Sequence, residues 1–158
     1  MTWLTPMLEW LQSTTLAAAV GDSLQITAVL SSAHLVGLTL VVGGALVSGL
    51  RMVGLLLPDG PVTAVAGAAR RGIVVGLLIS VSSGVLLLAP RAPWAFESNF
   101  FRMKMLWLLA AVTLHVILAI LLRRPIEGTP ISVRVLGGLQ LVAWFGVAVN
   151  GCLYILLE

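Results

Sequence analysis

Four long apolar segments constrain the fold of this chain more than any other feature of its sequence. They cover about residues 24–50, 62–88, 101–122 and 131–157, and each exceeds the roughly 20 helical residues that cross the hydrocarbon core of a bilayer. Only 9% of the residues are charged, against about 25% in a soluble domain, and no alternation of polar and apolar residues indicates strands. The sequence therefore predicts an all-α integral membrane protein, with one transmembrane domain that forms a four-helix up-and-down bundle in the lipid bilayer.

Basic residues near the ends of these segments predict the orientation of the bundle. The connections after the first and the third segment share six of them: Arg51, Arg70, Arg71, Arg123, Arg124 and Arg134. The connection after the second segment has three: Arg91, Arg102 and Lys104. Because basic residues favour the cytoplasmic side of a membrane, we expect a multi-pass protein of the bacterial inner (plasma) membrane with both termini outside the cytoplasm.

Residues 2–19 precede the first apolar segment and predict an interfacial amphipathic helix. One face of this helix carries the apolar residues Trp3, Leu4, Met7, Leu8, Leu11 and Leu16. The opposite face carries Glu9, Gln12 and Ser13. This pattern is typical of a helix that lies in the plane of a membrane surface, and the alternative is a loosely ordered tail.

The composition argues against several classes of function. The net charge is +3, but the basic residues are spread over helix ends instead of forming a patch, so we expect no nucleic-acid partner. The single cysteine, Cys152, permits no intrachain disulfide. No acidic residue lies in the middle of an apolar segment, which argues against a proton relay of carboxylates, and no nucleophile–base pair or phosphate-binding loop is present.

The two histidines, His34 and His115, both lie inside apolar segments, where an ionisable side chain is costly and is usually functional. His34 follows Asp22 by twelve positions, and His115 follows Lys104 by eleven. If Asp22 and Lys104 both mark the outer interface, the two histidines lie about 18 and 16 Å from it. The first and third helices are diagonal neighbours in an up-and-down bundle, so two imidazoles at one level can hold a flat group between them.

Haem b suits this arrangement, because two axial histidines must approach one iron from opposite faces. The sequence therefore predicts that His34 and His115 are the metal ligands of a single haem. For each histidine alone, a hydrogen bond to a polar residue of another helix is the simpler explanation. The polar residues available for it are Ser31, Ser82, Thr113, Gln140 and Asn150.

Small residues of the first two segments would leave room for the macrocycle. In the second segment they recur every four positions, as Gly72, Gly76, Ser80 and Gly84. We expect Gly37, Gly76 and Ser80 to border the cofactor. The same spacing also suits close packing of one helix on another, which is common in membranes.

Two basic residues of the third segment are candidates to pair with the haem propionates. Lys104 lies eleven positions before His115, close to the same helical face, and Arg102 is nearby. Charged hydrogen bonds of this kind are strong. The alternative is that both residues only anchor the helix at the interface.

Three short patterns occur together in the chain: HLVG over residues 34–37, GLRMVG over 49–54 and FRMK over 101–104. With the amphipathic N-terminal segment they make the chain similar to a family of small, uncharacterised bacterial four-helix membrane proteins. More distantly, the chain resembles membrane proteins of the cytochrome b561 and copper-resistance D types. The cytochrome b561 group uses four histidines for two haems, so two histidines imply one haem here.

We therefore expect a membrane b-type cytochrome-like protein that binds one haem between its first and third transmembrane helices. It would transfer electrons, with a quinol or a redox protein as its partner. The alternative is a non-catalytic subunit of a larger membrane complex, or of a homo-oligomer, that packs through its small residues. A third hypothesis is a copper-handling membrane protein, for which two histidines and one cysteine give an incomplete ligand set.

Overall fold

The computed structural model describes residues 4–123 and 128–157, and this part of the chain is helical apart from short turns. Its four long helices are α3 (Leu24–Val53), α4 (Val62–Leu88), α6 (Asn99–Leu121) and α7 (Ile131–Leu157). Each of them is long and apolar enough to cross a membrane. This result confirms the predicted all-α class, and the predicted segments agree with the observed helices to within three residues.

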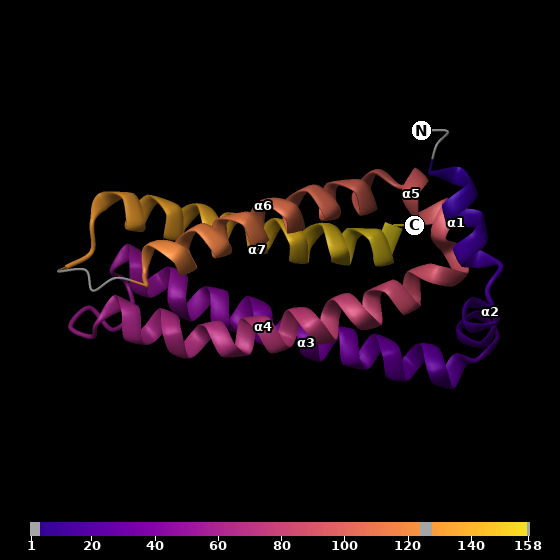
Figure 1. Cartoon of the computed structure of the whole chain (residues 1–158), viewed down its shortest axis with the longest axis horizontal. Helices are drawn as coiled ribbons and strands as arrows, with labels where there is room; N and C mark the ends of the chain where they lie inside the picture. The colour runs from indigo at the N-terminus through magenta and orange to yellow at the C-terminus, as the bar shows by residue number, and fades with distance from the viewer. Residues whose placement is uncertain (1–3, 124–127, 158) are drawn as a thin grey trace.

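The long helices run side by side along the longest axis of the molecule (Figure 1). Helix α3 packs against α4 and α7, and α6 packs against α7, whereas α4 and α6 make almost no direct contact. The chain termini lie at one end of the bundle, and the α3–α4 and α6–α7 connections lie at the other end. The bundle is therefore least tightly closed along the line between α4 and α6.

The turn between α3 and α4 is held by a buried arginine. Helix α3 ends at Val53 because Gly54 takes up a left-handed conformation with φ of 87°, which costs a glycine little. Arg51 is only 7% exposed. Its Nε donates a hydrogen bond of 2.9 Å to the carbonyl of Gly60, and its Nη2 also donates to that oxygen. Arg51, expected as a marker of topology, thus also fixes the geometry of this turn.

The N-terminal segment forms two short helices instead of the single helix expected over residues 2–19. These are α1 (Thr5–Gln12) and α2 (Thr15–Asp22). The chain breaks between them because Thr14 is extended and caps α2, where its Oγ1 accepts a hydrogen bond of 3.2 Å from the amide of Ala17. Residues 2 and 3 of the expected helix, and Arg124 of the expected cytoplasmic set, lie outside the described residues.

The two short N-terminal helices cover the terminal end of the bundle. Helix α1 packs against the 3-10 helix η1 (Ala89–Arg91) and against α5 (Ala92–Glu97), and α2 packs against η1, α3 and α4. Figure 1 shows them lying across the ends of the long helices. The connection from α4 to α6 is therefore itself helical and is part of this cover.

A small core joins the four long helices, and most of their remaining apolar surface faces outward. The core consists of Val41, Ala45, Ile73, Ala111, Ala143, Trp144 and Val147. Large apolar side chains stay exposed on all four helices, including Val29 at 68%, Leu78 at 65%, Leu109 at 67% and Phe145 at 59%. So much exposed apolar surface suits contact with lipid and not with water. The chain is accordingly a multi-pass membrane protein whose outer surface contacts the bilayer.

Candidate functional site

The half of the bundle next to the termini contains a cavity between the long helices. One hollow of about 150 Å³ is lined by residues of α3, α4, α6 and α7. A second hollow of about 320 Å³ extends from it toward η1 and α2. The two hollows share the lining residues His34, Gly84, Leu88, Phe101 and Lys104. We call the two adjoining hollows together the terminal cavity.

His34 lines the terminal cavity and is held by α4. Its Nδ1 lies 2.8 Å from the carbonyl oxygen of Ser80, and the hydroxyls of Ser80 and Ser83 lie 3.4 and 3.3 Å away. A carbonyl only accepts hydrogen bonds, so the carbonyl partner assigns the proton to Nδ1 and, in the neutral ring, the lone pair to Nε2. Histidines that ligate a metal usually have this arrangement.

Gly84 provides the space in which the imidazole lies. A Cβ atom placed on Gly84 would lie 3.1 Å from Cε1 and 3.3 Å from Nδ1 of His34. These distances are tighter than ordinary van der Waals contact, so a larger residue at this position would push the ring. The sequence predicted a small-residue stripe on α4, and Ser80 and Gly84 of that stripe do contact His34.

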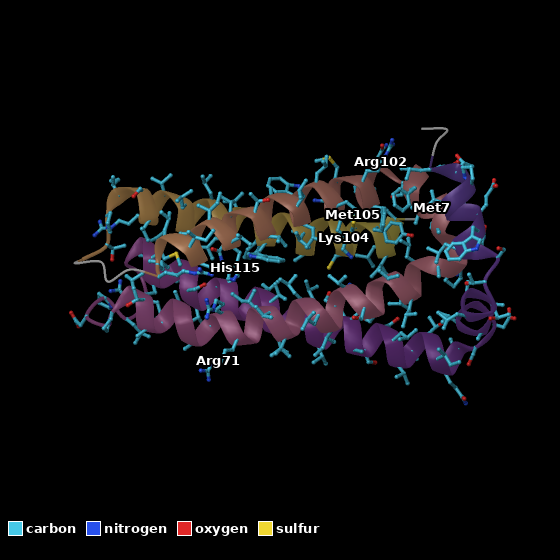
Figure 2. The ribbon with its side chains drawn as sticks, viewed as in Figure 1. Met7, Arg71, Arg102, Lys104, Met105 and His115 are labelled. Atoms are coloured by element: carbon cyan, nitrogen blue, oxygen red, sulfur yellow. The ribbon has the colours of Figure 1, made fainter. Side chains whose placement is uncertain are left out.

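Lys104 lines both hollows of the terminal cavity. Figure 2 shows it on the side of α6 that faces the interior of the bundle. Its ammonium lies close to Gly151 of α7, where an added Cβ would be 3.5 Å from Nζ. No ion pair joins Lys104 to a carboxylate of the described residues. An unpaired charge inside a membrane-spanning helix is costly and is usually functional.

Arg102 lies on a different face of α6 from Lys104. It is exposed, and its Nη2 donates hydrogen bonds to Oδ1 of Asn99 at 2.5 Å and to the carbonyl of Glu97 at 3.4 Å. In Figure 2 its side chain points away from the bundle. It lines a separate hollow beside α1 and α5. The structure therefore brings Lys104 to His34 but does not bring Arg102 there.

The other half of the bundle contains a second cavity, next to the α3–α4 and α6–α7 connections. We call it the loop cavity; its volume is about 250 Å³. Its polar lining residues are Ser48, Thr63, Arg70, His115, Arg123 and Gln140. Figure 2 shows His115 between the helices in this half of the molecule.

The loop cavity contains buried polar atoms without hydrogen-bond partners. Nε2 of Gln140 lies 3.5 Å from Nδ1 of His115. A hydrogen bond of this kind to a polar residue of another helix was the alternative to haem ligation in the sequence analysis. Nε2 of His115 and Oε1 of Gln140 are buried and have no partner among the described residues. Nε1 of Trp144, one helical turn further along α7, is also buried without a partner among the described residues, but Trp144 lines the terminal cavity. That Arg70 lines this cavity was not apparent from the sequence, because hydropathy does not show where each position of a helix lies relative to its neighbours.

The two histidines line different cavities, which share no lining residue among those described. Buried core residues separate the cavities along three helices: Ala45 on α3, Ile73 on α4 and Ala111 on α6. Lys104 lies at the level of His34, and His115 is eleven residues further along α6, or about 16 Å. The two histidines were expected at equal depth because Lys104 was assumed to mark the outer interface. The structure instead places it beside His34.

This separation bears on the expected ligation of one haem by both His34 and His115, which we call the haem clamp. Two axial ligands must reach one iron from opposite faces, and neither cavity contains both imidazoles. The pair His34 and His115 therefore does not fit a single haem. The terminal cavity by itself supplies one available imidazole, that of His34, and two basic lining residues, Lys104 and Arg91.

The glycines expected to border a cofactor contribute to helix packing. A Cβ on Gly37 would lie 2.7 Å from the amide nitrogen of Ser80 and 2.8 Å from the carbonyl of Gly76. A Cβ on Gly76 would lie 2.6 Å from the carbonyl of Gly37. Both glycines thus allow α3 and α4 to approach closely, and neither lines a described cavity.

Possible metal ligands are scattered over residues 4–123 and 128–157 of the chain. No group of three or more histidine, cysteine, aspartate or glutamate side chains gathers in that part of the chain. Cys152, considered for copper, is exposed near the end of α7.

Comparison with known proteins gives one match. A protein-family model described as a family of unknown function (DUF6644) matches residues 7–156. No curated protein and no solved structure matches the chain, so the distant resemblance to cytochrome b561-type and copper-resistance D-type proteins stays a prediction. Because the family match spans nearly the entire sequence, the chain belongs to this family of unknown function, DUF6644.

Proposed function

We propose that this chain is a membrane cytochrome-like protein that binds one haem b in the terminal cavity, with His34 as the axial ligand. The observation that supports this proposal most is the hydrogen bond of 2.8 Å between Nδ1 of His34 and the carbonyl of Ser80. It holds the ring in a fixed orientation and leaves Nε2 available for a metal. Haem would supply a one-electron couple, and the partner would be a membrane quinol or a redox protein.

The lining of the terminal cavity suits an amphipathic ligand with acidic groups. Its walls are mostly apolar, with Leu38, Leu77 and Leu108 among the lining residues. The ammonium of Lys104 is available to a propionate, and Arg91 lines the hollow of about 320 Å³ nearer the bundle end. That volume is within the range of cofactor sites, which starts at about 300 Å³.

His115 has a different role here from its role in the haem clamp expected from the sequence. In the clamp both histidines hold the cofactor, and in the present proposal only His34 does. His115 belongs to the loop cavity and would contribute nothing to ligation. The two versions can be separated by one pair of variants.

The test is the absorption spectrum of the detergent-purified chain, oxidised and then reduced with dithionite, together with a pyridine haemochrome assay. We expect about one haem per chain in the wild type and in His115→Ala, and none in His34→Ala. Loss of haem from both variants would instead support ligation of one haem by both His34 and His115. A colourless wild type from haem-sufficient cells would refute the proposal and favour the alternative of a subunit in a larger complex, which a pull-down then tests.

We also propose that the protein lies in the bacterial inner membrane with the terminal cavity toward the outside. The basic residues near the α3–α4 and α6–α7 connections support this orientation. Reporter fusions at each terminus test it, since a periplasmic reporter such as alkaline phosphatase should be active at both. Activity of a cytoplasmic reporter at both termini would show that the protein has the opposite orientation.

A further inference from the structure

The loop cavity has features of a binding site that the haem proposal does not use. Gln140 is only 1% exposed, lines the cavity and leaves its Oε1 without a partner among the described residues. Nε2 of His115, which lines the same cavity, is also buried and unpaired. Burying such atoms without a hydrogen bond costs about 1–3 kcal/mol each, so a bound partner would be favoured here.

The contact between Gln140 and His115 defines what that partner must offer. If Gln140 donates from Nε2 to Nδ1 of His115, the ring carries its proton on Nε2. The pair then presents one donor, Nε2–H of His115, and one acceptor, Oε1 of Gln140. If the amide is turned round, Oε1 accepts from Nδ1–H, and the pair presents an acceptor on the ring and a donor on the amide. Either assignment leaves at least one donor and one acceptor, because the amide nitrogen carries two N–H groups, and a hydroxyl group can satisfy one of each.

The same cavity carries positive charge. Arg70 and Arg123 both line it. Arg70 lies eight residues after the first residue of α4, about 12 Å along the helix, and forms no ion pair with a described carboxylate. None of the lining residues is acidic. Guanidinium groups pair well with carboxylates through two parallel hydrogen bonds.

We propose that the loop cavity binds a small hydroxycarboxylic acid, with the carboxylate at Arg70 and the hydroxyl at the His115–Gln140 pair. A plain carboxylate only accepts hydrogen bonds, so it would leave the acceptor of that pair unsatisfied. An alcohol would satisfy the pair but leave the arginines without an anion. The apolar lining residues Met52 and Leu118 provide a surface for a short carbon chain. This inference concerns a different cavity and does not rest on the haem proposal.

Isothermal titration calorimetry on the full chain in detergent tests this site. The probes are lactate and 3-hydroxybutyrate, with propionate and butyrate as partners that lack only the hydroxyl, and lactamide as a partner that lacks the charge. We expect at least one hydroxy acid to bind about 5- to 10-fold more tightly than its plain acid, since two hydrogen bonds are gained. Lactamide and inorganic phosphate should bind more weakly than either hydroxy acid.

Two variants assign the interactions, and one serves as a control. Arg70→Gln should weaken binding of every acid about 10- to 100-fold, as expected for a lost charged hydrogen bond. Arg71→Gln is the matched control, because the side chain of Arg71 points away from the bundle in Figure 2, and it should bind like the wild type. Gln140→Leu should bind lactate and propionate equally.

Several results would overturn the proposal. These are no binding of either hydroxy acid at millimolar concentration, tighter binding of phosphate than of both, and an equal loss in Arg70→Gln and Arg71→Gln. If Gln140→Leu does not fold, the affinity of the wild type for hydroxy acids relative to plain acids still tests whether the His115–Gln140 pair binds the hydroxyl. Equal affinity for hydroxy and plain acids in the wild type would refute that role.

Discussion

The terminal cavity and the loop cavity are built from similar parts and differ in chemistry. Each contains one histidine and at least one basic side chain without a described carboxylate partner. In the terminal cavity the histidine contacts a main-chain carbonyl, and in the loop cavity it contacts a side-chain amide. The carbonyl fixes the proton on one nitrogen, whereas the amide permits either. The carbonyl contact therefore leaves a lone pair on Nε2 of neutral His34, whereas the amide contact leaves Nε2 of His115 as either a donor or an acceptor.

The largest expected effect is on haem content. His34→Ala should reduce bound haem from about one per chain to none, because Nε2 of His34 is the proposed ligand. His115→Ala should keep its haem, since the proposed haem site lies in the terminal cavity, which His115 does not line. The pyridine haemochrome assay measures both. Equal haem content in His34→Ala and His115→Ala would contradict the proposal that only the terminal cavity binds haem.

The second effect concerns a glycine that lies against the imidazole. In Gly84→Ala the new methyl group would lie 3.1 Å from Cε1 of His34, so the ring would have to shift by a few tenths of an ångström. We expect haem affinity to fall about tenfold, which corresponds to about 1.4 kcal/mol. Titration of the apoprotein with hemin measures it. Unchanged affinity would mean that the ring position does not matter for the ligand.

The third effect concerns the unpaired ammonium of the terminal cavity. Lys104→Met should raise the free energy of unfolding of the haem-free chain by about 1–3 kcal/mol, since a charge in a membrane span is costly. The same change should weaken haem binding. Arg102→Met is the matched control because Arg102 is exposed and pairs with Asn99. Denaturation in mixed micelles measures the free energy of unfolding of both variants. A loss of stability in Lys104→Met would contradict the interpretation that the Lys104 ammonium is an unpaired charge.

The smallest effect is expected in the loop cavity. Gly67 lines it and has nothing within 4 Å of an added Cβ. Gly67→Ala should therefore stabilise the chain by about 0.5–1 kcal/mol through helix propensity and leave haem content unchanged. Thermal unfolding measures the stability of both Gly67→Ala and Gly84→Ala, and we expect Gly84→Ala to be the less stable of the two variants. Destabilisation by Gly67→Ala would indicate that the cavity is more tightly packed than the structure describes.

Much of the fold could be predicted from local sequence. The bounds of α4 and α7 agree with the expected segments over residues 62–88 and 131–157, because hydropathy and the flanking proline, glycine and arginine residues act locally. The N-terminal break at Thr14 was missed, since a capping residue inside an amphipathic pattern is a weak signal. The small residues of α4 were predicted to line a cofactor site, and only Ser80 and Gly84 of the four line the terminal cavity.

The sequence by itself determined the class of this protein, the number of its long helices and the presence of two intramembrane histidines. Only the tertiary structure decided how far each helix is shifted along its axis and which basic side chains face inward, as Lys104 does and Arg102 does not. The physical reason is that hydropathy is satisfied by many axial shifts and rotations of a helix. The contacts of Gly37 with α4 and of Trp107 with Gly146 of α7 select one of them. That selection separates His34 from His115.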